Sequence, residues 1–161
     1  MWEIKNLDHG YADYFDKWFP YFKYKSDLVQ DNTNNCLSKN CFATKNLLKF
    51  VGDVEFLDII EELKSICEKC VNKKLEYFYL HMIDYENGGE MASHKHDHNE
   101  DYSFILYLNS CEDGDTLLHL DPEIKIKPVK DKMVLFSSDI VHSAIFSNKK
   151  RILVGGLKLC H

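Results

Sequence analysis

Three histidines and the single arginine of this chain are the residues whose types and spacing point to chemistry. His94 and His96 flank Lys95, His142 follows 46 residues later, and Arg151 stands alone among nineteen lysines. Alternate side chains of a β-strand point to one face, so His94 and His96 can direct two ring nitrogens at one point while Lys95 faces away. The pattern predicts a metal site with His142 as its third ligand.

Arg151 suggests that the metal site also binds an acid. A planar guanidinium presents paired donors that match a carboxylate, and it keeps its charge. Neutral imidazole suits zinc, copper, nickel and iron alike, so spacing alone does not name the metal. The alternative interpretation is a solvated surface, because residues 96–101 form a polar, charged run.

Short runs of strand-forming residues fill the second half of the chain and must position these side chains. Two helices and about seven closely spaced strands predict an antiparallel barrel or sandwich with helices on one outer face. Turn residues separate most of the runs, which we place at residues 75–85, 103–108, 115–120, 123–127, 132–136, 143–146 and 152–157.

The first half of the chain predicts two amphipathic helices around an irregular segment. Aromatic residues at helical spacing in residues 9–24 indicate a helix that Pro20 ends or kinks. Residues 27–46 are polar and rich in turn formers, which is typical of a surface loop near a substrate entrance. A second helix runs from Asp53 to near Asn72 with its apolar residues on one side.

Length and composition indicate one soluble domain, with residues 1–74 as helical support and surface loop and residues 75–161 as the β-barrel core that carries the metal site. The chain has 161 residues, is 45% hydrophobic and has a formal charge of −6, which disfavours nucleic acid as a partner. Because we find no membrane segment or secretory signal, we expect a cytoplasmic protein. The aromatic N-terminal helix is a possible homodimer face.

The six cysteines are expected to be thiols, because the cytosol is reducing. Their spacing leaves open a tetrahedral zinc site made from Cys36, Cys41, Cys67 and Cys70.

Further motifs surround the histidines, and together they resemble the 2-oxoglutarate and iron(II)-dependent dioxygenases over roughly residues 77–157, phage and bacterial members especially. The matching residues are Tyr85-x2-Gly88-x5-His94-x-His96, Phe104 to Asn109, Gly114 to Thr116, Asp121-Pro122, Pro128, Val134 to Phe136, His142 and Arg151. The resemblance implies a mainly β fold with N-terminal helices, a double-stranded β-helix of jelly-roll or cupin-like form. It also implies hydroxylation of an unidentified substrate with Fe(II) and 2-oxoglutarate.

Residue by residue, the resemblance makes His94, His96 and His142 the iron ligands and Arg151 the group that grips the far carboxylate of 2-oxoglutarate. Tyr85 is the first choice for a hydroxyl that shares this carboxylate, ahead of Tyr77 and Tyr79. The prime substrate is expected to be a peptide side chain or a small metabolite. The family usually has aspartate or glutamate where this chain has His96, so the ligand set is one negative charge poorer.

Three alternatives remain open from the sequence. Gly88-x5-His94-x-His96-x3-Glu100 also follows the first motif of the cupins, in which Glu100 would be a fourth ligand of a metal-dependent dioxygenase or isomerase. A non-catalytic barrel that binds a ligand is the second. In the third, Asp97 or His98 takes part in the metal site, although Asp97 would face away from His94 and His96 unless a bulge intervenes.

Overall fold

The computed structural model describes residues 1–25, 29–33, 37–50, 53–96 and 99–161. In this part of the chain, antiparallel strands come before, between and after two α-helices and one 3-10 helix in the sequence. The elements are β1 (Trp2–Asn6), α1 (Tyr11–Tyr24), β2 (Val29–Thr33), β3 (Ser38–Lys39), β4 (Cys41–Thr44), η1 (Leu47–Lys49), α2 (Val54–Val71), β5 (Leu75–Asp84), β6 (Gly89–His94), β7 (Tyr102–Tyr107), β8 (Thr116–Leu118), β9 (Ile124–Ile126), β10 (Lys132–Ser137), β11 (His142–Ser147) and β12 (Arg151–Leu159).

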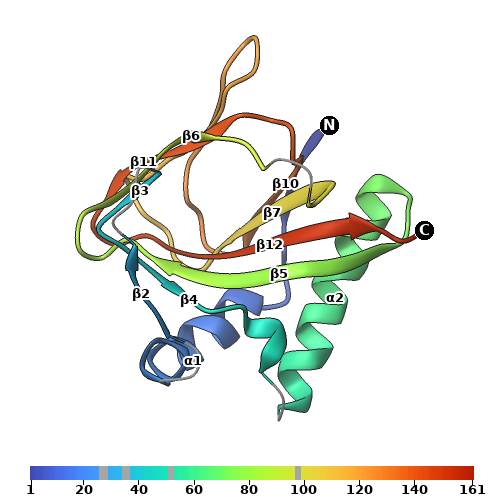
Figure 1. Cartoon of the computed structure of the whole chain (residues 1–161), viewed down its shortest axis with the longest axis horizontal. Helices are drawn as coiled ribbons and strands as arrows, with labels where there is room; N and C mark the ends of the chain where they lie inside the picture. The colour runs from blue at the N-terminus through green and yellow to red at the C-terminus, as the bar shows by residue number, and fades with distance from the viewer. Residues whose placement is uncertain (26–28, 34–36, 51–52, 97–98) are drawn as a thin grey trace.

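The strands form two antiparallel sheets, and the helices lie beneath the larger one (Figure 1). The larger sheet has the order β1-β10-β7-β12-β5-β4-β2, and the smaller sheet has the order β3-β6-β11-β8-β9. Strands far apart in sequence are neighbours in both sheets, as β12 is of β5 and β7. The mainly β fold with N-terminal helices is as predicted.

Alternation along the strands divides the interior into two hydrophobic clusters. On β7, Phe104 and Leu106 face the helices, whereas Ile105 and Tyr107 face the smaller sheet. Residues 133–136 of β10 alternate in the same way. The larger sheet is therefore covered on both faces, by helices on one side and by the smaller sheet on the other.

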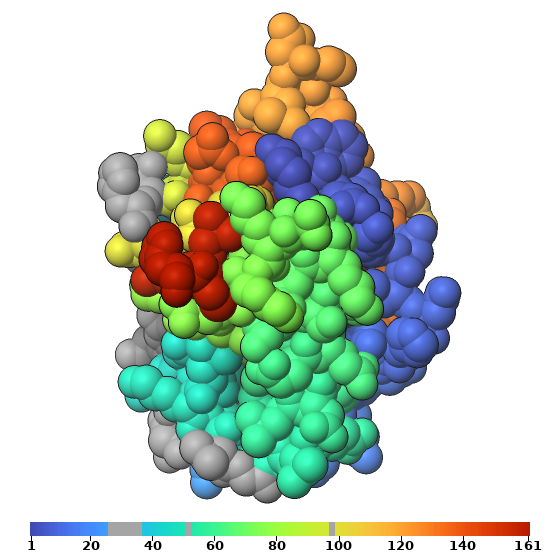
Figure 2. All heavy atoms as spheres, turned by 90° about the vertical axis from the view of Figure 1, so that its right-hand side faces the viewer, coloured from blue at the N-terminus to red at the C-terminus, as the bar shows by residue number. Residues whose placement is uncertain are grey.

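The helix α2 begins and ends where its sequence signals predict. The Asp53 side chain accepts a hydrogen bond from the Glu55 amide at 2.9 Å, which caps the first turn. Asn72 ends the helix in the left-handed conformation, with φ of 54°. In Figure 2 the green α2 covers this side of the molecule, next to the blue N-terminal segment.

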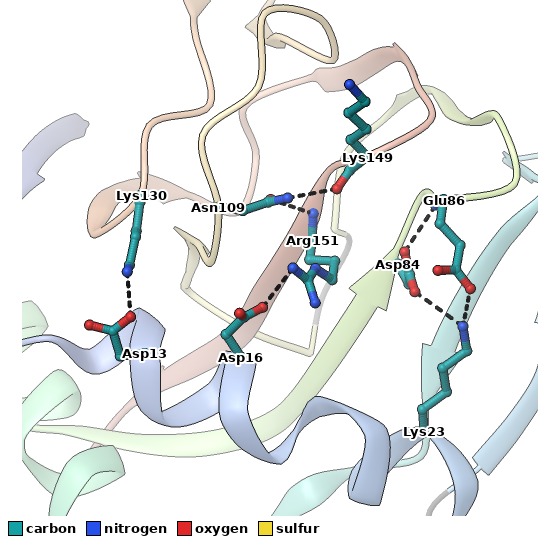
Figure 3. Close-up of polar contacts among 9 residues, drawn as sticks. All are labelled: Asp13, Asp16, Lys23, Asp84, Glu86, Asn109, Lys130, Lys149 and Arg151. Carbon is teal, nitrogen blue, oxygen red and sulfur yellow. Dashed lines mark hydrogen bonds and ion pairs between the residues drawn. The ribbon is translucent and has the colours of Figure 1, made fainter.

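The aromatic stripe of α1 is part of the core, since Phe15, Phe19 and Phe22 are buried. Pro20 lies inside the helix, which continues to Tyr24, so the prediction that it could end the helix was wrong. Ion pairs also join α1 to the barrel (Figure 3). Lys23 pairs with Asp84, with 3.2 Å between Nζ and Oδ2.

Residues 27–46 were wrongly predicted to be an irregular loop throughout. They contain β2, β3 and β4, and β4 pairs with the edge of β5. Apolar and polar residues alternate too weakly in this segment to predict strands. The open edge of β5 provides hydrogen-bond partners that stabilise β4 as a strand. Residues 1–74 therefore contribute strands β1 to β4 to the sheets as well as helices. None of the helices in the described ranges is long and apolar enough to span a membrane.

Candidate metal centre

The structure brings the three predicted histidines together at one end of the strand pair β6 and β11 in the smaller sheet. His94 ends β6, His142 begins β11, and the two residues are directly opposite each other in the antiparallel pair. The strand β6 stops at His94, so His96 lies beyond it and not, as predicted, on the same strand. The three imidazoles still converge, because one candidate ligand atom from each lies within 4.8 Å of the others.

Each of the three rings uses its Nδ1 atom in a hydrogen bond that orients it. His94 Nδ1 lies 2.8 Å from the Ala92 carbonyl oxygen, and His142 Nδ1 lies 3.0 Å from the Ile140 carbonyl oxygen. Since a carbonyl only accepts, these two Nδ1 atoms carry the proton and their Nε2 atoms hold a lone pair. His96 Nδ1 contacts the Glu100 carboxylate instead. Such outer contacts are typical of metal-binding histidines.

Burial keeps the site in the protonation state that binds metal. Desolvation lowers the pKa of His94 from its ordinary value of 6.5 and lowers the pKa of His142 to about 3. At neutral pH both rings are neutral, so their Nε2 atoms are available as ligands. The donor set fits Fe(II), which accepts imidazole nitrogen, as do zinc, copper and nickel.

The histidines open onto a cavity between the two sheets. It has a free volume of about 80 Å³ and opens to solvent. Its walls are mostly apolar, so the site excludes much of the solvent. The lining residues are Tyr79, Ile83, Tyr85, Met91, His94, His96, Ser103, Phe104, Ile105, Thr116, Phe136, His142, Ser143, Ala144, Ile152 and Val154.

A family model described as the 2OG-Fe(II) oxygenase superfamily matches residues 76–156, which is 81 of the 161 residues and includes all three histidines. The chain belongs to this oxygenase superfamily. The predicted recognition is therefore confirmed, and with it an enzyme that uses Fe(II) and 2-oxoglutarate. No curated protein matches the sequence of this oxygenase.

Solved structures of oxygenases share the fold of this chain over nearly its whole length. A prolyl-4-hydroxylase from Pseudomonas putida has a TM-score of 0.77 at 16% identity, covering 99% of this chain and 92% of that one. A viral collagen prolyl hydroxylase from Paramecium Bursaria Chlorella virus-1, in complex with 2OG, has a TM-score of 0.71 at 16% identity, covering 99% and 96%. HygX from Streptomyces hygroscopicus, with nickel, 2-oxoglutarate and hygromycin B bound, has a TM-score of 0.72 at 8% identity, covering 98% and 82%. The predicted double-stranded β-helix is thus confirmed.

The oxygenase places Arg151 away from its cavity. The guanidinium reaches α1, where Nη2 lies 2.8 Å from Asp16 Oδ1, and it lies 5.4 Å from the centre of the Phe19 ring (Figure 3). Ile152 and Val154 of β12 line the cavity, so Arg151, one residue out of phase with them, faces the helices. The structure does not bring Arg151 together with the histidines.

The tyrosines predicted to assist Arg151 lie in three different places. Tyr85 lines the cavity and is 1% exposed. The Tyr77 hydroxyl donates to the Ile60 carbonyl on α2 at 2.6 Å, on the far side of the sheet. The Tyr79 hydroxyl lies 3.0 Å from His96 Nδ1 and donates to Glu100. Tyr79 and Tyr85 both line the cavity, but only the Tyr79 hydroxyl contacts His96 among the described contacts.

Lys150, which the sequence analysis did not single out, is a fully buried cation behind this cavity. Its side chain is 0% exposed, its Nζ donates to the Gly114 carbonyl at 2.6 Å, and Nζ lies 4.3 Å from the centre of the Tyr85 ring. Among the described residues no carboxylate pairs with it. Burial lowers the pKa of Lys150 from 10.5 to about 8. Lys150 lies two residues before Ile152, so the sequence indicated that the two side chains share a face. Only the folded barrel shows that this face points inward.

The other predicted ligands that the structure describes are not part of the histidine group. Within the described ranges only the three histidines come together as a metal cluster. Glu100, the fourth ligand of the cupin alternative, contacts the outer nitrogen of His96 and not the point where the rings converge. Cys41, Cys67 and Cys70 lie outside any such group. Asp97, His98 and Cys36 lie outside the described residues.

Proposed function

We propose that His94, His96 and His142 hold Fe(II) in this oxygenase and that the apolar cavity beside them receives 2-oxoglutarate and the prime substrate. The observation that carries the proposal is the convergence of three imidazoles whose Nδ1 atoms all contact an acceptor, which leaves three Nε2 atoms for one ion. With O2 as the oxidant, bound Fe(II) and 2-oxoglutarate would supply the oxidative decarboxylation of 2-oxoglutarate to succinate and CO2, coupled to hydroxylation of a substrate C–H bond. The chain orients both and excludes water.

For the far carboxylate of 2-oxoglutarate we propose Lys150 in place of the predicted Arg151. A buried ammonium without a carboxylate partner among the described residues is costly, and a bound dicarboxylate would relieve that cost. Lys150 lies against Tyr85, whose ring lines the cavity. We propose that Tyr85, whose hydroxyl was predicted to share this carboxylate, contributes the neighbouring wall of the carboxylate site.

An anaerobic titration tests both assignments. Wild-type protein with Fe(II) is expected to develop the visible charge-transfer band of a chelated 2-oxo acid as 2-oxoglutarate is added, and His142→Ala is expected to lose the band with the metal. Absence of Fe(II) binding by the wild type would refute the site.

The adjacent pair Lys150→Met and Arg151→Met separates the two candidate anchors. Loss of a charged hydrogen bond is worth roughly 1.5–3 kcal/mol, so Lys150→Met should weaken 2-oxoglutarate binding by about 10- to 100-fold while Fe(II) still binds. Arg151→Met should leave it unchanged. The opposite result would return the role to Arg151.

We place a peptide side chain, and a prolyl residue first, ahead of a small metabolite as the prime substrate. The support is that two similar structures spanning nearly the whole of this chain are prolyl hydroxylases. Incubation with proline-containing peptides, free amino acids and small alcohols would test the choice by succinate formation and by the gain of one oxygen atom in mass. Turnover of small metabolites alone would reject it.

A further inference from the structure

His96 differs from the other two histidines in what holds its outer nitrogen. Backbone carbonyls accept from His94 and His142, whereas the carboxylate of Glu100 contacts His96 Nδ1. The position that lacks the family's usual carboxylate is therefore the one that has a carboxylate directly behind it.

Glu100 is buried in a way that an ordinary surface glutamate is not. Its side chain is 4% exposed, and it accepts hydrogen bonds from Tyr79 Oη at 3.2 Å and Ser103 Oγ at 3.3 Å. The Ser138 hydroxyl also donates to the Glu100 carbonyl at 2.6 Å, which fixes the backbone. No lysine or arginine of the described ranges pairs with Glu100. A metal ion bound to His96 would therefore supply the positive charge that this carboxylate faces.

The neighbouring strand leaves space for this carboxylate. A Cβ atom added at Gly156 would lie 2.1 Å from Glu100 Oε2 and 2.4 Å from the Tyr79 ring, so only glycine fits beside the pair. The register of β12 against β5 also shifts between Gly156 and Leu157. Residues from β5, β7, β12 and the segment after β10 therefore build the surroundings of Glu100.

We propose that Glu100 is a positioning residue that supplies, through His96, the negative charge absent from the metal ligands themselves. A carboxylate on Nδ1 fixes the ring orientation and raises the donor strength of Nε2, as in carboxylate–histidine–metal triads. The inference rests on the three-histidine site proposed above. On this inference, His94, His96 and Glu100 together carry the same charge as the imidazole and carboxylate ligands that the family usually has.

The test compares Fe(II) affinity in Glu100→Gln and Glu123→Gln by anaerobic competition with a chelator. Glu123 is the matched control, because it forms the same i,i+4 pair with His119, at 2.9 Å, outside the metal group. Loss of the outer partner of a metal ligand typically costs about 10- to 100-fold in affinity, which we expect for Glu100→Gln and not for Glu123→Gln. Equal affinities in the two variants would overturn the inference.

A second readout separates charge from mere packing. Removing the carboxylate should raise the Fe(III)/Fe(II) midpoint potential of the bound metal, since a weaker donor stabilises Fe(III) less. An unchanged potential would also contradict the role. If Glu100→Gln does not fold, Gly156→Ala keeps the carboxylate but displaces it, and a wild-type affinity there would overturn the inference. Failure of the wild type itself to bind Fe(II) would instead refute the three-histidine site.

Discussion

At the residue scale, two adjacent cations have opposite surroundings. Arg151 forms an ion pair with Asp16 in which the side chains are 31% and 40% exposed, while Lys150 is fully buried. The Arg151 contact is Coulombic, since Asp16 Oδ1 accepts no hydrogen bond of good geometry. The enzyme therefore maintains a buried ammonium against Tyr85, next to the cavity in which we propose that 2-oxoglutarate binds. On this proposal, the function of Lys150 opposes stability.

The pH dependence of stability should reveal the buried lysine. The pKa of Lys150 is about 8 in the folded state and 10.5 for an unperturbed lysine, so between these values the unfolded chain binds more protons. Stability of the wild type therefore rises with pH in this window through Lys150. Lys150→Met removes the buried ammonium and should be more stable than the wild type at neutral pH. At about 1.36 kcal/mol per pKa unit, this difference in the free energy of unfolding should shrink by up to roughly 3 kcal/mol as the pH rises through the window.

Urea unfolding of the metal-free proteins at several pH values between about 7 and 10 measures this difference. Comparing variants cancels the opposing effect of buried thiols and tyrosines. Arg151→Met serves as the control, because its difference from the wild type should stay constant. A constant difference for Lys150→Met as well would contradict the buried ammonium.

At the element scale, α1 is held to the barrel mainly by apolar burial. Phe15 and Phe22 are 0% and 1% exposed, and both pack against Phe56 of α2. Among the ion pairs of α1 drawn in Figure 3, Asp13–Lys130 and Asp16–Arg151 are solvated, whereas Asp84, the partner of Lys23, is buried. Burial of a phenylalanine contributes several kcal/mol, whereas a solvated ion pair contributes at most about 1.

Two sets of variants compare these contributions. Phe15→Ala should reduce the free energy of unfolding by about 3–5 kcal/mol, since a large cavity opens in the helix-facing core. A double-mutant cycle of Asp16→Asn and Arg151→Met should give a coupling energy of only about 0.2–1 kcal/mol. Chemical denaturation checks both values, and a coupling as large as the cavity effect would show that ion pairing dominates.

At the scale of the whole molecule, the metal should couple to the stability of the fold. The three histidines come from β6, the segment after it, and β11, so a bound ion joins segments that are distant in the chain. A ligand that binds only the folded state stabilises it by mass action. The smaller sheet is the part that the ion would hold together.

Thermal unfolding with and without Co(II) or Ni(II) measures this coupling. A metal at a hundred times its dissociation constant adds about 2.7 kcal/mol, and each kcal/mol raises Tm by roughly 2–4 °C in a chain of this size. His142→Ala should lose the rise in Tm. His81→Gln should keep it, because His81 has the same Nδ1-to-carbonyl contact, at 2.8 Å, outside the metal group. An equal rise in His142→Ala would place the metal elsewhere.

The sequence by itself determined the candidate ligands and most of the elements that carry them. The spacing of His94, His96 and His142 predicted three imidazoles around one point, and they converge. Period-two patterns located strands such as β7 and β10, and Asp53 predicted the start of α2. These features are local, so they can be read from neighbouring residues. The sequence placed His94 on a strand but gave that strand no bounds, because the residues of β6 are poor strand formers that depend on pairing with β11 and β3.

Only the tertiary structure decided which cation is buried against Tyr85 and what lies behind His96. A shift of one residue along a strand moves a side chain to the opposite face, and the turn between β11 and β12 sets that phase. It turns Lys150 inward and Arg151 toward α1, although the spacing from His142 favoured the arginine. Glu100 reaches His96 because Gly156, far along the chain, leaves the space. Such facts depend on contacts between distant segments, which spacing does not encode.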